Sequence, residues 1–269
     1  MFYLLYALKS DQMKNALSLV CMFLAGILLS TSSFAQSNTL FNPDYNGDGF
    51  IGVDDILGAL SFYDTAWAGP VSPSWSCGEA ITYAGVGYST VQIGDQCWFA
   101  ENLRTTTYLN GEAIPQNLSY GDWSSTTSGA MAFYTDGPAY GGLYNWYAVD
   151  DARGLCPFGW HVPSDGEWTM LTDHLGGEFV AGTQMKANFG WNFGGNGTNS
   201  SGFSGLPGGI RVYYDGHFNS AGSDGCWWSS SSNGSDAWYR YLYTYNENVY
   251  RVNDDPRSGF SVRCVRDAE

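Results

Sequence analysis

The chain is poor in charged residues, and above all in basic ones. Only 14% of its 269 residues are charged, and 11 Lys and Arg stand against 26 Asp and Glu, which gives a net charge of −15. Binding to nucleic acid depends on clustered Lys and Arg, so this composition excludes a nucleic-acid partner. The same shortage argues against an anionic membrane surface as the partner.

Motifs of catalysis are also scarce. The sequence has three histidines, His161, His174 and His217, and it contains no Cys-x-x-Cys pair, Gly-x-Ser-x-Gly elbow or phosphate-binding loop. We expect His161 to bond the backbone near the start of a helix. The sequence therefore favours a protein that is not an enzyme, although it leaves catalysis open.

Glycine and aromatic residues are abundant instead, with 35 glycines and an aromatic content of 17%. Aromatic side chains mainly build cores, but an exposed ring also suits the C–H face of a sugar. We expect most tryptophans to be buried and a minority to form sugar-stacking platforms. The candidates are Trp123, Trp146, Trp191, Trp227, Trp228 and Trp238.

The first 35 residues have the pattern of an export signal. Lys14 precedes the apolar run 16–29, and the small residues Ser33 and Ala35 follow it at the spacing of a cleavage site. Translation starts at Met1 or at Met13. We expect cleavage after Ala35, a secreted or outer-surface protein, and no membrane span in the mature chain; the alternative is an uncleaved anchor.

Residues 44–55, DYNGDGFIGVDD, have the spacing of a calcium-binding loop. Alternate positions of such a loop point oxygen atoms inward, and Gly49 lies where the chain must turn sharply. The predicted Ca²⁺ ligands are Asp44, Asn46, Asp48, the carbonyl of Phe50 and Asp55. The loop resembles those of dockerins, although dockerins carry two repeats and this chain has one. The alternative is an Asp- and Gly-rich turn whose spacing is accidental.

Beyond this calcium segment, residues 36–64, the Pro- and Ser-rich residues 65–76 read as a linker. Residues 89–98 alternate and turn at Gly94-Asp95, which predicts a hairpin. Ser164 and Glu167 have the spacing of a capping box before a helical pattern that ends at Gly176-Gly177. A second helix is predicted over residues 143–151, and short strands over the last third of the chain.

Several sequence stretches, in order, resemble the Fibrobacter succinogenes major paralogous domain family. They are VQIGDQCWFAENLRTTTYLNGEAIP, LYNWYAVDD, LCPFGWHVPSDGEWTML, FSGLPGGIR, WWSSS and GFSVRCVRD. The resemblance assigns residues 77–269 to one domain and implies a secreted or surface protein without a settled activity. The ending also resembles the C-type-lectin-like fold of formylglycine-generating enzymes. This implies an α+β domain of twisted antiparallel strands, one or two helices and long loops.

Five cysteines remain after removal of the signal peptide, and in an oxidising compartment most of them should pair. Cys77 and Cys97 flank the predicted hairpin region and form one hypothetical pair. The resemblance implies that Cys156 and Cys264 form a second pair that ties the core together. Cys226 is then left as an unpaired thiol, most simply a small buried apolar residue.

The sequence thus predicts a secreted or surface binding module with an extracellular polysaccharide or protein as its ligand. Two alternatives stay open. One is an enzyme of the formylglycine-generating type, which holds copper on a pair of cysteines; the counterparts here lie in the predicted disulfides or are missing. The other is a structural spacer in a surface layer.

Overall fold

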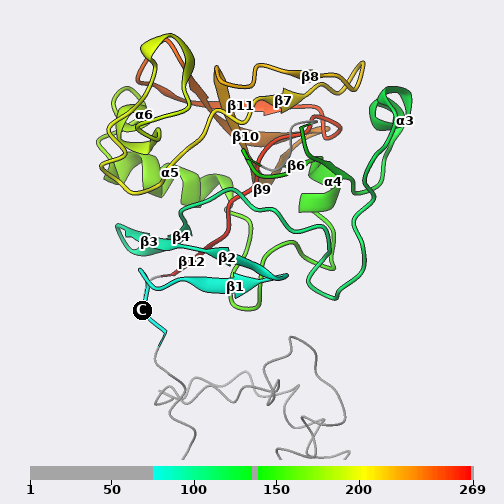
Figure 1. Ribbon diagram of the computed structural model, residues 1–269, viewed down its shortest axis with the longest axis horizontal. Coiled ribbons are helices and arrows are strands. Elements are labelled where there is room, and N and C mark those ends of the chain that lie inside the picture. Colours follow the sequence, from blue (N-terminus) through cyan, green and yellow to red (C-terminus); the bar gives the residue numbers. More distant parts are fainter. Residues whose placement is uncertain (1–74, 135–138, 268–269) are drawn as a thin grey trace, which may run out of the picture. The chain divides into compact units, whose positions relative to one another are not determined.

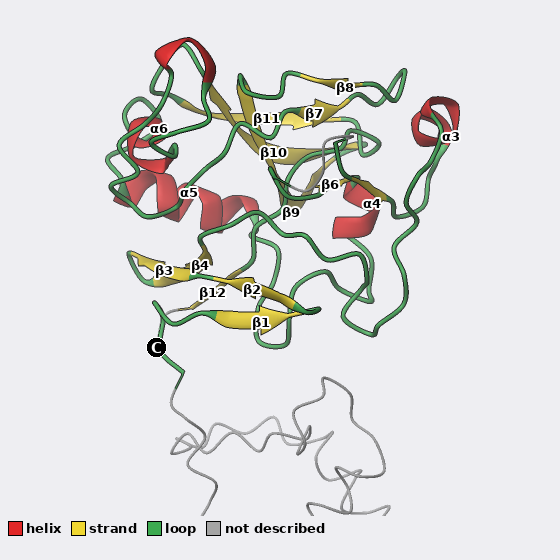
Figure 2. Cartoon of the chain, viewed as in Figure 1, coloured by secondary structure: helices red, strands yellow, loops and turns green. Residues whose placement is uncertain are grey.

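A computed structural model describes residues 75–134 and 139–267 of the chain. The predicted signal peptide, the calcium segment with its five ligands, and nearly all of the linker lie outside the described residues. The described part is a domain of small antiparallel sheets, a few short helices and long loops (Figure 2), which agrees with the predicted α+β class.

The first two sheets come from both ends of the domain. Their strands are β1 (Ile81–Tyr83), β2 (Val86–Tyr88), β3 (Thr90–Ile93), β4 (Gln96–Phe99) and β12 (Val265–Asp267). β1 and β2 pair with each other, and the second sheet has the order β12-β4-β3. The turn at Gly94-Asp95 joins β3 to β4, so the predicted hairpin is confirmed. The last strand of the chain therefore closes on the first hairpins of the domain.

The largest strands form a second layer above these hairpins (Figure 1). They are β9 (Asp224–Asn233), β10 (Asp236–Tyr243) and β11 (Val249–Asp254), in the order β11-β10-β9. The remaining strands form two short two-stranded sheets: β5 (Met131–Ala132) with β6 (Leu143–Tyr144), and β7 (Ile210–Arg211) with β8 (Phe218–Asn219). All of these pairs are antiparallel.

The helices are α3 (Tyr120–Ser125), α4 (Trp146–Val149), α5 (Asp165–His174) and α6 (Ala181–Met185), with a 3₁₀ turn η1 (Asn192–Gly194). The predicted capping box starts α5: the Ser164 hydroxyl accepts from the Glu167 N–H, and the Glu167 carboxylate accepts from the Ser164 N–H. Of the helix predicted over 143–151 only α4 is helical, so that prediction was too long. Residues 143–144 pair in β6 instead, and the Asn145 side chain caps α4 by accepting from the Ala148 N–H.

Trp227 and Trp228, adjacent on β9, divide the core between the two faces of the large sheet. Successive side chains of a strand point to opposite faces, and both indoles are fully buried. Trp227 packs in a cluster with α5 and the β3–β4 hairpin, where Trp168 and Trp98 lie. Trp228 packs in the other cluster, with Phe260. Core side chains therefore pack against both faces of β9.

Two disulfides tie this arrangement together. Cys77 bonds Cys97, and Cys156 bonds Cys264; the Cα atoms of each pair are 5.8 Å apart. These are the two pairs set out above, and Cys226 is a buried free cysteine. The second bridge closes a separation of 108 residues, and a bridge of that span stabilises a fold by about 4–5 kcal/mol in the chain-entropy description.

Candidate functional site

Most of the tryptophans predicted as candidate sugar-stacking platforms are buried. Trp123, Trp191, Trp227 and Trp228 are at most 5% exposed. Trp146 and Trp238 are half-buried. The Trp146 indole N–H donates to the Ser229 carbonyl, and the Arg251 guanidinium covers the Trp238 ring at 3.5 Å from its centroid. Within the described residues, the tryptophans thus serve the scaffold, and an exposed binding surface must come from other rings.

Cys226 lies on β9, 3% exposed, and burial raises the pKa of its thiol well above the ordinary value. A reactive cysteine needs a lowered pKa and access to solvent. The described residues contain no second free thiol beside it. Its surroundings therefore match a small apolar residue better than a catalytic or copper-binding one.

His161 bonds a side chain rather than the backbone that the sequence suggested for its ring. Its Nε2 lies 2.5 Å from Oε1 of Glu167, the residue that caps α5. This bond raises the pKa of His161. Burial favours the neutral acid of Glu167, but hydrogen bonds from His161 and Ser164 outweigh it and lower its pKa to about 2. The pair fixes the start of α5, which is a structural role.

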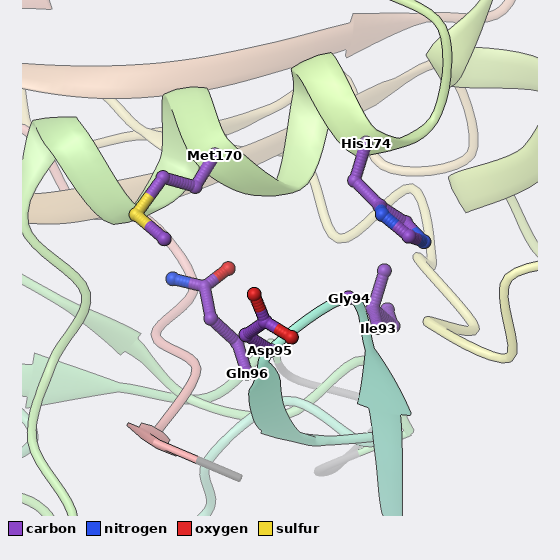
Figure 3. Close-up of a pocket in the computed structure, with 6 residues that line it drawn as sticks. All are labelled: Ile93, Gly94, Asp95, Gln96, Met170 and His174. Carbon is purple, nitrogen blue, oxygen red and sulfur yellow. The ribbon is translucent and has the colours of Figure 1, made fainter.

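A small cavity of about 320 Å³ lies between the β3–β4 turn and α5. Figure 3 shows Met170 and His174 of the helix facing Asp95 and Gln96 of the turn. The Gln96 amide is already used, since it donates to the Glu167 carbonyl at 3.3 Å. With side chains from two elements only, this cavity offers a ligand few groups.

A richer surface follows β10 beyond its end. Tyr241, Tyr243 and Tyr245 alternate with Leu242 and Thr244, which are buried on the opposite face. Tyr250 of β11 stands beside Tyr241, and Phe193 of η1 beside Tyr245. We call these five rings, Tyr241, Tyr243, Tyr245, Tyr250 and Phe193, the aromatic ladder. It runs from half-buried rings to rings in open solvent, since Tyr245 is 61% and Phe193 76% exposed.

The ladder has two parts that face different ways. Tyr241 is tilted by about 33° from Tyr243 and by 32° from Tyr250, with ring centroids 5.6–5.9 Å apart. We call these three rings the floor. Tyr245 then turns by 68° from Tyr243 and stacks on Phe193 at 5.4 Å and 16°. We call this stacked pair the wall.

The backbone holds Phe193 in solvent at a cost. Its φ of 55° lies in the left-handed region, where a non-glycine residue is strained. Burying such a ring would gain about 1.5–3 kcal/mol, a gain that this conformation forgoes. Residues in strained conformations persist only where the surroundings fix them, so the contacts beneath the wall decide whether it is a built feature.

Those contacts join η1 to the β10–β11 turn at residues 244–248. The Thr244 hydroxyl donates to the Asn192 carbonyl, and the Asn192 N–H donates to the Gly222 carbonyl at 2.7 Å. A side chain at Gly195 would place its Cβ 2.2 Å from the Thr244 carbonyl oxygen, so only glycine allows the two loops to approach so closely. The wall therefore depends on close packing between η1 and the β10–β11 turn.

Lys186, which follows α6, binds the same turn through its side chain. Its side chain is 3% exposed, its Nζ donates to the carbonyls of Tyr243 and Asn246, and it lies 4.7 Å from the centroid of the Trp191 ring. Burial lowers its pKa to about 8. A buried lysine is costly unless its donors are used, and here two of them hold the turn that carries Tyr245.

Polar groups border the rings. Asn246 and Asn248 each donate a side-chain N–H to the Tyr250 hydroxyl, at 3.0 and 3.2 Å. The Tyr241 hydroxyl donates to Asp224 at 3.2 Å. Among the described residues, the Tyr243 and Tyr245 hydroxyls have no protein partner. The ladder thus combines aromatic rings with hydroxyl and amide groups.

Sequence reasoning missed the ladder because it followed tryptophan. Two signals were present: the alternating YLYTY of residues 241–245, and the repeated Asn-Phe-Gly on either side of Trp191 in NFGWNFG, residues 188–194. Alternation predicts which tyrosines share a face. It does not tell which of the two faces is covered, and this decides whether the rings are exposed.

Comparisons with known proteins give one match. The family model for the Fibrobacter succinogenes major domain matches residues 91–266, from β3 to β12. No curated protein and no solved structure matches the chain. The matched region holds nearly all buried residues of the two core clusters, the Cys156–Cys264 bridge and all five rings of the ladder. The chain therefore belongs to the Fibrobacter succinogenes major domain family.

Proposed function

We propose that this domain is a non-catalytic binding module outside the cytoplasm and that it holds a carbohydrate on the aromatic ladder. The observation that carries the proposal is the wall, in which Phe193 and Tyr245 stand stacked in solvent on fitted loops. Exposed apolar rings that a protein fixes in place mark interaction surfaces. Fixing them in advance lowers the entropic cost of binding.

The chemistry of the ladder favours a sugar over an apolar peptide. Ring faces pack against the C–H faces of pyranoses, whereas the hydroxyls of Tyr243 and Tyr245 and the amides of Asn246 and Asn248 offer hydrogen bonds to sugar hydroxyls. A peptide-binding groove would be more uniformly apolar at its centre.

The enzyme alternative has less support. It requires thiols that a substrate can reach, and Cys226 is buried within the sheet, where it pairs in register with Tyr241. A structural spacer would not explain why Phe193 is held exposed in a strained backbone conformation. We also retain as a proposal that the scaffold is C-type-lectin-like, a fold whose loops commonly present ligand sites.

Export completes the proposal. The sequence carries the pattern of a signal peptide, and the two disulfides fit an oxidising compartment. Within the described ranges, every helix is too short or too polar to traverse a bilayer. We propose secretion or display on the outer surface, which protease accessibility on intact cells would test.

Carbohydrate binding is tested on a glycan array with the Phe193→Ala/Tyr245→Ala double variant. We expect the wild type to bind at least one glycan, and the variant to bind it at least about tenfold more weakly because the wall is gone. The matched control is Phe158→Ala/Tyr214→Ala, which removes a Phe 82% exposed and a Tyr 69% exposed elsewhere on the domain. A wild type that binds no glycan, or a control as damaged as the variant, would contradict the proposal.

We also propose one calcium ion at residues 44–55. The support is the sequence spacing of Asp44, Asn46, Asp48, Phe50 and Asp55, because this segment lies outside the described residues. Calorimetric titration of the mature chain should give a calcium-binding heat that Asp48→Asn abolishes. An unchanged heat in that variant would place the ion elsewhere.

A further inference from the structure

The shape and charge of the ladder restrict its ligand further. We propose that the ladder takes single, uncharged glycan chains and rejects both flat crystalline polysaccharide surfaces and acidic glycans. This inference rests on the proposed carbohydrate binding and adds the physical form and the charge of the ligand. It follows from two observations, the angle between floor and wall and the distribution of charge around them.

The angle decides the physical form. The floor rings lie within 33° of their neighbours, but the wall turns by 68° from Tyr243. A flat crystal face presents all its sugar rings in one plane, so it can contact the floor or the wall but not both. A surface built for a flat polymer would keep its rings coplanar.

A single chain meets no such limit. Its sugar rings turn relative to one another about the glycosidic bonds, so one sugar can lie on the floor while the next packs against Tyr245. The wall then receives the chain where its direction changes. Contacts to both parts add up for the chain, whereas a crystal face must lose one of them.

Charge decides the second restriction. Asp224 accepts the Tyr241 hydroxyl beside the floor, and Glu247 is exposed in the turn that carries the wall. The cation that contacts the same turn, Lys186 after α6, is 3% exposed and donates to the carbonyls of Tyr243 and Asn246. A uronate or sulfate on the ladder would therefore face carboxylates and, among residues 75–134 and 139–267, find no accessible cation beside these five rings.

The opposite face of β11 shows that the contrast is local. There Arg251 pairs with Asp165 at 2.9 Å and covers Trp238, and Arg240 bonds the same carboxylate. Cations are thus placed on the face that packs on α5 and kept away from the ladder. This separation would be without purpose on a surface that binds anionic chains.

The experiment uses the mature full chain and matched polymers. Soluble β-glucan, mannan and xylan are each tested in native and carboxymethylated form by affinity electrophoresis, and crystalline cellulose and chitin by pull-down. We expect at least one native soluble polymer to bind and its carboxymethylated form to bind at least about fivefold more weakly at low salt. High salt should reduce this difference, because it screens exposed charges. Neither crystalline polymer should retain the protein.

Glu247→Gln gives an independent test of the charge argument. It should strengthen binding of the carboxymethylated polymer and leave the native polymer unaffected. Glu178→Gln is the control, since it removes an exposed carboxylate whose electrostatic partners are Arg240 and Arg251 of the other face. Equal binding of native and carboxymethylated forms, or retention on a crystalline polymer, would overturn the inference. If no polymer of either kind binds, the proposed function itself fails.

Discussion

The aromatic residues of β9 and those that follow β10 belong to one sheet but are used in opposite ways. Trp227 and Trp228 are fully buried, and their indole N–H groups donate to Asn102 Oδ1 and the Tyr144 carbonyl, both at 2.8 Å. Tyr245 and Phe193 are mostly exposed and stack on each other, and Tyr245 also meets the Tyr243 ring edge-on. Aromatic side chains thus build the scaffold at Trp227 and Trp228, whose polar atoms are paired inside, and a surface at Tyr245 and Phe193.

The largest effect is expected from Trp227→Ala. The indole fills the cluster between the sheet and α5, so its removal leaves a cavity and takes one of two donors from Asn102 Oδ1, which Arg263 still contacts. We expect the free energy of unfolding to fall by about 3–5 kcal/mol. Urea denaturation followed by tryptophan fluorescence measures it. A loss below about 1 kcal/mol would mean that the buried region is no more critical than the ladder.

A smaller loss is expected from Arg263→Met. Arg263 is fully buried, and it donates to the carbonyls of Phe99 and Phe203 and to Asn102 Oδ1, each at 2.7 Å. Methionine fills similar space but removes a buried donor from the Phe99 and Phe203 carbonyls, while Asn102 Oδ1 keeps the Trp227 indole, and this loss should cost about 2–4 kcal/mol. Thermal unfolding of the two proteins provides the measurement. A neutral or stabilising result would show that the guanidinium is dispensable to the scaffold.

The His161–Glu167 pair should produce a milder, pH-dependent effect. The pKa of His161 is raised, so its stabilisation is present below its unfolded pKa near 6.5 and is lost as pH rises through the folded value. The pKa of Glu167 is lowered to about 2, so its stabilisation is present above 4.5 and is lost as pH falls from there. Urea midpoints between pH 3 and 9 should therefore decline at both ends. In His161→Asn the decline at the alkaline end should disappear.

The smallest effect on stability belongs to the ladder. Phe193→Ala/Tyr245→Ala removes two rings that bury little surface, so the free energy of unfolding should change by less than about 0.5 kcal/mol. Relief of the strain at Phe193 does not follow, because alanine at φ 55° is strained as well. Differential scanning calorimetry makes the comparison. A fall in the free energy of unfolding comparable to that of Trp227→Ala would show that the wall is part of the scaffold, and it would contradict a role in ligand binding.

Local signals gave the parts of the fold that depend on local chemistry. The Gly94-Asp95 turn and the Ser164–Glu167 capping box act within a few residues, and both were predictable. The full helix over 143–151 was not predictable, because Leu143 and Tyr144 form contacts with residues distant in sequence. They pair with the strand at Met131, and the Tyr144 N–H donates to the Phe260 carbonyl. The ladder was missed for the same reason. Its exposure depends on how η1 meets the β10–β11 turn, which spacing in sequence does not encode.

The closure of β12 on β4 has a mechanical consequence. Arg266 of the last strand lies opposite Cys97, whose disulfide leads directly to Cys77, and Cys264 just before it is locked to Cys156. A pull that enters at Cys77 and leaves at Asp267 is therefore expected to load a covalent bridge and one short pair of strands. None of the five ladder rings lies on that path, so tension along the polypeptide would leave the proposed sugar contacts undisturbed.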